Sequence, residues 1–234
     1  MYSNYLLKKF PVYKFSNFKK KVSKLDFELY EKNGTIFQRL KKKNELFLKK
    51  NYSSKISNSI QMNESKHRLK HSKLFMQKLN SKIKNLKNKK VLDIGCGNGF
   101  LLFKLSRKGA KVVGVESSQN IKKIKGIKIY DKLEDVDNQK FDLIIHNCYL
   151  EHEFNLKRFI KTKIKFLKKD GKIFFCVPDN KRLIRDGDAN LINHEHLAYF
   201  TKASLKNYFL KNSRFSLKID NDKATKEMLE KEEY

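Results

Sequence analysis

Short apolar runs alternate with amphipathic stretches along the chain after residue 90. Strands and helices that alternate at this length indicate βαβ units around a parallel sheet. The pattern therefore predicts an α/β fold with a doubly wound, mostly parallel sheet. Gly109 and Gly171 are expected just past helix ends, where glycine is common. The expected strands are VLDIG (91–95), KVVGVE (111–116), IKIY (127–130), FDLIIHN (141–147) and KIFFCVP (172–178), and the expected helices are FLLFKLSRKG (100–109), a short piece after Ser118 and NLKRFIKTKIKFLKKDG (155–171).

Residues 1–88 show a different pattern, which predicts a helical region. The stretches FQRLKKKNELFLKK (37–50) and KLFMQKLNSKIKNL (73–86) are read as helices, with lysine on one face of each. In the second, Phe75, Leu79, Ile83 and Leu86 share the opposite face. The polar stretch between them, residues 51–65, is rich in Ser and Asn and is read as a loop. We expect a helical cap at residues 1–88, a main domain at 89–220 and a charged tail at 221–234.

The formal charge of +29 is concentrated in the N-terminal region. Residues 1–90 hold 25 basic and 5 acidic side chains, which is +20 of the total. Many lysines beside a phosphate backbone would release counterions, so the charge leaves nucleic acid open as a partner. However, Lys and Asn fill most surface positions and Arg is scarce, a pattern that a biased genome composition also gives. The charge alone therefore does not favour nucleic acid.

Neither the apolar runs nor the cysteines indicate a membrane or secreted protein. No apolar run reaches the roughly 18 residues of a spanning helix, and the start, MYSNYLLKKFPVYKF, lacks the apolar core of a secretory signal. Cys96, Cys148 and Cys176 are odd in number, widely spaced and set in apolar segments, which fits reduced thiols better than a disulfide framework or a zinc site. A cytoplasmic location and no bound metal are expected.

The stretch VLDIGCGNGF (91–100) contains the first expected strand of the α/β region and, after it, closely spaced glycines. A dinucleotide fingerprint, G-x-G-x-x-G, would need a third glycine at Phe100, and a phosphate-binding P-loop would need Gly-Lys-Ser/Thr. Neither is present. Instead Gly95, Gly97 and Gly99 form a G-x-G-x-G loop, which lets the backbone turn through positive φ and approach a ligand closely.

This loop, with Asp93 before it, Glu116 closing the next strand, and the later FDLII and LEH, resembles the class I S-adenosylmethionine-dependent methyltransferases over about residues 88–219. The resemblance implies a Rossmann-like sheet, an enzyme and S-adenosylmethionine as its cofactor. It also implies that Glu116 accepts hydrogen bonds from both ribose hydroxyls and that Asp93 faces the ammonium end of the cofactor. A structural alternative for Asp93 is to brace the loop. The expected cofactor-binding residues are Asp93, Gly95, Cys96, Gly97, Asn98, Gly99, Glu116, Ser117, Asp131 and His146, with Glu134 an alternative to Asp131 near the adenine.

The later segments CVPDN and NHEHLAYFTKASLKNYF resemble the small-molecule branch of that family, whose members methylate sugars, quinones or lipid-linked precursors. The expected function is therefore methyl transfer to oxygen or carbon of a small molecule or glycoconjugate precursor. The motifs of base methylation are missing after FDLIIHN, but ribose or phosphate methylation of RNA remains an alternative. A non-catalytic protein that only binds S-adenosylmethionine is a second alternative. The family's antiparallel seventh strand is expected to be missing, because only a charged tail follows RFSLKID.

Histidines near the predicted strand ends are the candidates for removing a proton from the acceptor, since the pKa of histidine lies near neutral pH. His194 is the preferred base, with His196 and His152 as the other candidates. His152 in Leu150–Glu151–His152 has bracing of the loop as its structural alternative. His194 and His196 flank Glu195, but a metal site would need another anchored ligand.

Overall fold

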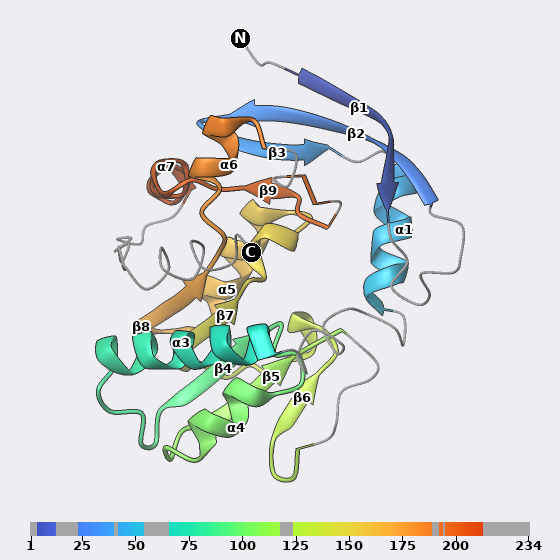
Figure 1. Cartoon of the computed structure of the whole chain (residues 1–234). Helices are drawn as coiled ribbons and strands as arrows, with labels where there is room; N and C mark the ends of the chain where they lie inside the picture. The colour runs from blue at the N-terminus through green and yellow to red at the C-terminus, as the bar shows by residue number, and fades with distance from the viewer. Residues whose placement is uncertain are drawn as a thin grey trace.

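A five-stranded parallel sheet forms the centre of the α/β region in the computed structural model, which describes residues 4–12, 23–39, 42–53, 66–117, 124–188, 192–193 and 195–212 (Figure 1). The strand order is β6-β5-β4-β7-β8, and every neighbouring pair is parallel. The order reverses between β4 and β7, which is where ligands bind in open sheets of this class. The strands are β4 (Lys90–Ile94), β5 (Lys111–Val115), β6 (Lys128–Tyr130), β7 (Phe141–Asn147) and β8 (Leu167–Cys176).

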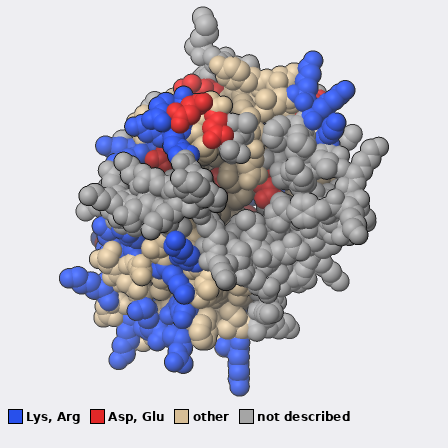
Figure 2. Space-filling view, viewed as in Figure 1, with Lys and Arg blue, Asp and Glu red and all other residues tan. Residues whose placement is uncertain are grey.

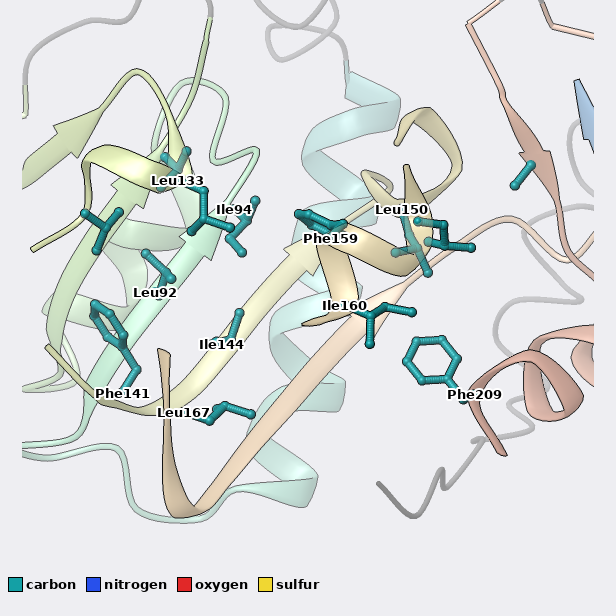
Figure 3. Close-up of a cluster of buried hydrophobic side chains, with 14 of the residues drawn as sticks. Leu92, Ile94, Leu133, Phe141, Ile144, Leu150, Phe159, Ile160, Leu167 and Phe209 are labelled. Carbon is teal, nitrogen blue, oxygen red and sulfur yellow. The ribbon is translucent and has the colours of Figure 1, made fainter. Parts of the chain in front are cut away.

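Helices cover both faces of this sheet, so the predicted doubly wound α/β fold is confirmed. In β7, Leu143 and Ile145 pack with α3 (Lys66–Lys82) and α4 (Phe100–Ser106), whereas Ile144 packs with the opposite layer. That layer contains α5 (Leu156–Phe166) and α7 (Lys202–Asn212), and Figure 3 shows Phe159, Ile160 and Phe209 gathered beside Ile144. Each fully buried Leu, Ile or Phe stabilises the fold by about 1.5–3 kcal/mol relative to an exposed one.

The apolar face predicted for residues 73–86 forms the inner side of α3 and of the turn after it. Phe75, Leu79 and Leu86 are buried and Ile83 is partly buried, all in the cluster that also holds Val91 and Leu105. The ring of Phe75 meets the edge of Phe174 on β8, with centroids 5.0 Å apart. This helix therefore belongs to the α/β core, although the sequence placed it in the N-terminal cap.

A second, antiparallel sheet joins the start of the chain to its later part, and it corrects the prediction that residues 1–88 are helical. Its order is β1-β2-β3-β9, where Ile36 pairs with Tyr199 and Phe37 with Ala198. Only α1 (Lys42–Ser53) and α3 are helices within the described part of residues 1–88. The strands are β1 (Asn4–Val12), β2 (Ser23–Lys32), β3 (Thr35–Arg39) and β9 (Ala198–Tyr199).

The local sequence explains these strands. Leu25, Phe27 and Leu29 alternate with charged residues in β2, and Phe27 is fully buried. Between β2 and β3, Asn33 and Gly34 have φ values of 55° and 76°. An Asn-Gly pair with both residues in the left-handed region is the preferred two-residue hairpin turn. The predicted helix at 37–50 therefore starts later, at Lys42, because residues 37–39 belong to β3.

The two glycines predicted to end helices behave differently. Gly109 has a φ of 81° just after α4, as expected. Gly171 lies inside β8 instead, since α5 passes directly into this strand. A Cβ built at Gly171 would lie 2.9 Å from Leu167 Cδ2 and 3.0 Å from the carbonyl oxygens of Lys168 and Phe141. The pairing of β7 with β8 shifts register beside it, between Phe141 and Leu143. Glycine is thus required there by close packing and not by a helix end.

Several predictions fall outside the described residues. These are residues 54–65 of the predicted loop, the short helix after Ser118, the missing seventh strand and the tail at 221–234. The first three residues of the predicted loop, 51–53, are helical instead, because α1 extends to Ser53. The division at residues 88 and 220 remains a prediction. Among the helices that are described, none has the length and apolar character to cross a membrane.

Candidate active site

The carboxyl ends of the parallel strands bring most of the predicted site residues to one edge of the sheet. The glycine loop follows β4, Glu116 follows β5, and Asp131 and Glu134 follow β6. Residues 148–152 follow β7, where η2 (Leu150–His152) is a single 3-10 turn. The topology therefore places the predicted cofactor and acceptor segments side by side across the switch between β4 and β7.

The glycine loop has the backbone conformation expected of it. Gly95, Gly97 and Gly99 have φ values of 73°, 53° and 75°, all in the left-handed region. Gly99 is the residue before α4, and its amide donates to the carbonyl of Cys96 at 2.9 Å. A Cβ on Gly95 would lie 2.3 Å from Tyr149 Cδ2, and one on Gly99 would lie 2.2 Å from Ile124 Cδ1. A side chain at Gly95 would therefore displace the ring of Tyr149, and one at Gly99 would displace the end of the Ile124 side chain, before any ligand is considered.

Glu116 lies against this loop. Its Oε2 accepts a hydrogen bond from the amide of Gly97 at 2.9 Å, which fixes the carboxylate at the tip of β5. The amides of Gly95 and Cys96 both donate to the carbonyl of Val115, the residue before Glu116. The loop and the acid thus form one hydrogen-bonded unit.

Asp93 is a buried carboxyl group in the middle of the sheet. Its exposed fraction is 1%, and within the described part of the chain neither carboxylate oxygen has a hydrogen-bond partner. Burial, with a smaller effect from the negative charge of Glu116, raises the pKa of Asp93 to about 8. Buried polar groups are normally hydrogen-bonded, so an unpartnered carboxyl at this position suits a ligand that carries donors or positive charge.

The other predicted cofactor residues are placed around this unit. Cys96 is buried, and burial raises the pKa of its thiol. The side-chain oxygen of Asn98 accepts from the amide of Phe100 at 3.1 Å, which braces the start of α4. Ser117, Asp131 and Glu134 are exposed, the last in η1 (Leu133–Asp135). The structure thus leaves the choice between Asp131 and Glu134 as a prediction.

His146 does not lie at the open edge. It is fully buried beneath α5, stacked on Phe175 with ring centroids 4.8 Å apart, and its Nε2 is 2.9 Å from Nζ of Lys163. Burial lowers the pKa of Lys163 to about 7, and burial together with Lys163 lowers the pKa of His146 well below its usual value. This buried position does not support His146 as a cofactor-binding residue. Lys163 is a buried lysine on the apolar face of α5 that sequence reasoning missed.

Tyr149 connects the glycine loop after β4 to the segment after β7, and sequence reasoning also missed this residue. Its ring packs against Gly95 on one side and lies 5.2 Å, centroid to centroid, from Phe159 of α5. Burial, followed by the charge of Glu153, raises the pKa of its hydroxyl. The negative charge of Glu116 also raises the pKa of Tyr149. The segment that follows β7 is therefore in direct contact with the glycine loop.

His152 has a defined orientation. Its Nδ1 lies 2.9 Å from the carbonyl oxygen of Glu195, its Nε2 lies 4.0 Å from Oε1 of Glu151, and its ring meets that of His196 edge-on at 4.9 Å. A carbonyl oxygen can only accept, so Nδ1 must carry the proton. In the neutral ring, Nε2 then holds the lone pair and can accept a proton.

Backbone hydrogen bonds hold the segment 195–199 in place. The amide of Leu197 donates to the carbonyl of Glu151, and the amide of Gln38 in β3 donates to the carbonyl of Leu197 at 2.9 Å. The hydroxyl of Tyr199 lies within hydrogen-bonding distance of Gln38 Oε1 (3.1 Å) and of the carbonyl of Asn193 (3.0 Å). The structure thus brings His152 and His196 together, while His194, the preferred base from the sequence, lies outside the described residues.

Basic side chains are not confined to the N-terminal region. Figure 2 shows Lys and Arg over the lower part of the face on which α3 and α4 lie in Figure 1. The exposed basic residues of these elements include Lys70, Lys73 and Lys82 in α3 and Lys104, Arg107 and Lys108 in α4 and the turn after it. The basic surface thus continues across residue 88 onto the α/β region.

Comparison with known proteins agrees with the resemblance. A family model described as a methyltransferase domain matches residues 41–213. The ubiquinone biosynthesis O-methyltransferase of Pelagibacter ubique is 39% identical over 119 residues, covering 45% of this chain and 48% of that protein. The mitochondrial protein of the same name from Bos taurus is 31% identical over 116 residues, covering 43% of this chain and 31% of that protein. This chain therefore spans half or less of the length of these relatives.

Solved structures support the fold. A complex of DhpI with SAM and HEP superimposes with a TM-score of 0.52 at 12% identity, covering 72% of this chain and 87% of that chain. An S-adenosylmethionine-dependent methyltransferase from Mesorhizobium loti gives a TM-score of 0.50 at 14% identity, covering 67% and 88%. At these identities the likeness concerns the arrangement of the chain alone.

Proposed function

The chain belongs to the class I S-adenosylmethionine-dependent methyltransferases, and from this premise we propose that it methylates an oxygen atom of a small phenol- or quinol-type molecule. The relatives named for ubiquinone biosynthesis support this acceptor class among those the sequence left open. The single observation that carries the proposal is the contact between Tyr149 and Gly95, because it joins the cofactor loop to the segment that holds Glu151 and His152.

Asp93, the glycine loop and Glu116, which we call the cofactor half of the sheet edge, fit S-adenosylmethionine. The unpartnered carboxyl of Asp93 suits its ammonium group, and the carboxylate of Glu116, fixed by the Gly97 amide, suits two ribose hydroxyls. The left-handed glycine loop lets the backbone approach the ligand closely, because no Cβ intervenes. When bound, the cofactor supplies an electrophilic methyl group on a sulfonium.

The segment after β7 and residues 195–199, which we call the acceptor half of the sheet edge, supply the base in this proposal. His152 Nε2, which holds the lone pair, would accept the hydroxyl proton of the acceptor. The methyl group supplied by the cofactor would pass to that oxygen, and the sulfonium sulfur would be left as a neutral thioether. The positive charge that forms on the imidazole is stabilised by Glu151, whose Oε1 is 4.0 Å away. Glu195, through its carbonyl, keeps the ring oriented during the transfer. We assign the base to His152 in preference to His194 because the Glu195 carbonyl fixes the tautomer of His152 and Glu151 lies beside its Nε2.

The test uses the purified chain with S-adenosylmethionine and a panel of catechols and hydroquinones, with mass spectrometry for the added methyl group. We expect a methylated product from at least one phenolic acceptor and none from the matching methyl ethers. His152→Ala should lower kcat by roughly 10²–10⁴-fold, the usual share of general-base catalysis. Its affinity for S-adenosylhomocysteine should stay within about twofold of the parent, since no cofactor residue changes.

His196→Ala is the matched control, because this ring meets that of His152 edge-on, and the substitution leaves the contact of His152 with the Glu195 carbonyl in place. We expect a smaller loss of kcat from it than from His152→Ala. Full turnover by His152→Ala would move the base to His194 or His196. Folded protein that binds neither S-adenosylmethionine nor S-adenosylhomocysteine would contradict the proposed activity as a whole.

A further inference from the structure

Three side chains that are far apart in the sequence converge at the α3 side of the sheet edge. His71 Nε2 on α3 lies 4.0 Å from Sγ of Cys148, after β7, and 3.9 Å from Sγ of Cys176, at the end of β8. All three ligand atoms lie within 4.8 Å of one another, and all three residues are partly buried. From the geometry we propose that His71, Cys148 and Cys176 form a binding site for a zinc-class divalent metal ion. This proposal is independent of the proposed function.

The spacing of the ligand atoms suits such an ion. Zinc bound tetrahedrally at about 2.0–2.1 Å from nitrogen and 2.3 Å from sulfur places nitrogen and sulfur about 3.6 Å apart. The observed distances of 3.9 and 4.0 Å exceed this by a few tenths of an ångström. Small side-chain rotations can therefore bring the three atoms onto one ion.

The backbone holds the two cysteines side by side. The amide of Cys148 donates to the carbonyl of Cys176 at 3.0 Å, where the ladder between β7 and β8 ends. Cys148 itself has a φ of 51°, a left-handed conformation that costs a non-glycine residue roughly 1–2 kcal/mol. Residues in such conformations cluster at functional sites.

The chemistry of the donors also favours a metal. Zinc binds thiolate and neutral imidazole. Three protein ligands leave a fourth position for water or another oxygen ligand, as in zinc sites that do chemistry. Cys148 also directly precedes Tyr149, so an ion here would fix the start of the segment that carries Glu151 and His152.

The proposal is tested on the full chain, reduced and freed of metal under anaerobic conditions. We expect one Zn²⁺ per chain in competition with a chromophoric chelator. Co²⁺ should give a thiolate-to-metal charge-transfer band together with the visible bands of tetrahedral cobalt. Cys148→Ser, Cys176→Ser and His71→Gln should each weaken metal affinity by at least about tenfold.

Cys96→Ser is the matched control, because Cys96 is the remaining cysteine of the chain. It should leave the metal affinity and the cobalt spectrum unchanged. His152→Gln should do the same, which separates this site from the second group of potential ligands, Glu151, His152 and His196. Circular dichroism on every variant verifies that it is folded.

Three results would overturn the proposal. These are no metal uptake by the reduced protein, a cobalt spectrum without thiolate character, and a metal affinity that survives Cys148→Ser and Cys176→Ser.

Discussion

The two halves of the sheet edge are built in different ways. On the cofactor half, Asp93, the glycine loop and Glu116 come from one continuous stretch of β4, α4 and β5, and the Gly97 amide joins the loop to Glu116. On the acceptor half, Glu151 and His152 meet Glu195 and His196 through a backbone bond from Leu197. Gln38, from the start of the chain, holds this segment from the other side.

Because of this difference, the two halves should tolerate different kinds of substitution. The cofactor half depends on backbone conformation, so a single added methyl group disturbs it. The acceptor half depends on contacts between distant segments, each worth about 0.5–1.5 kcal/mol. Substitutions in the two halves should therefore affect cofactor affinity, acceptor turnover and stability in different proportions.

The largest effect is expected from Gly95→Ala. The new Cβ would lie 2.3 Å from Tyr149 at a φ of 73°. Left-handed strain and overpacking together should lower the free energy of unfolding by roughly 2–4 kcal/mol. Displacement of Tyr149 should weaken S-adenosylhomocysteine binding by at least about tenfold. Thermal unfolding and calorimetry measure the two quantities.

Gly126→Ala is the control for backbone strain. Gly126 has a similar φ of 78°, but its Cβ would have nothing within 4 Å. It should cost only about 1–2 kcal/mol of stability and leave binding unchanged. Equal effects of the two substitutions would show that contact with Tyr149 has no role in cofactor binding.

An intermediate effect is expected from Asp93→Asn, through the pH dependence of stability. The pKa of Asp93 is raised from 3.8 to about 8, so the folded state binds more protons than the unfolded state between these pH values. Its contribution to stability is therefore lost as pH rises through this window. The amide cannot titrate, so the stability of the variant should fall by about 1–3 kcal/mol less than that of the parent between pH 5 and pH 8.

Denaturant unfolding of both proteins at a series of pH values provides this measurement. Parallel curves for parent and variant would mean that Asp93 is ionised in the folded protein at neutral pH. In that case a hydrogen-bond donor from the protein, and not a ligand, would satisfy its carboxylate.

The smallest effect is expected from Tyr199→Phe on the acceptor half. It removes the hydroxyl that lies 3.1 Å from Gln38 Oε1 and 3.0 Å from the Asn193 carbonyl. Loss of one hydrogen bond should cost about 0.5–1.5 kcal/mol of stability. Cofactor affinity should stay within experimental error, and acceptor KM should rise. A change in cofactor affinity larger than the change in KM would show that the halves are not independent.

Much of the α/β region was predictable because its signals are local. The expected strand at 141–147 matches β7, and those around Asp93 and Gly114 match β4 and β5 to within one residue. The glycine loop was recognisable for the same reason, since its residues adjoin in sequence. Gly171 was misread because glycine marks both helix ends and close packing, and only the register shift in β8 distinguishes them.

The N-terminal sheet was missed although its signal was present. The alternation at Leu25, Phe27 and Leu29 and the Asn33–Gly34 turn together indicate a hairpin. In contrast, no local pattern could bring His71 to Cys148 and Cys176, because α3, β7 and β8 meet only through the sheet topology. The orientation of His152 likewise depends on the carbonyl of Glu195 and has no signature in its own neighbourhood.

The pairing of β3 with β9 has a consequence for the order in which the protein forms during synthesis. Residues 35–39 leave the ribosome long before Ala198 and Tyr199, and Tyr199 bonds to Gln38 across a separation of 161 residues. Until then the hairpin of β2 and β3 presents an unpaired strand edge, which can pair with other chains. Contacts over such separations form slowly, because the intervening chain must first be ordered. We expect the segment beside His152 to be the last part of the site to assemble on a nascent chain, well after the cofactor loop has folded.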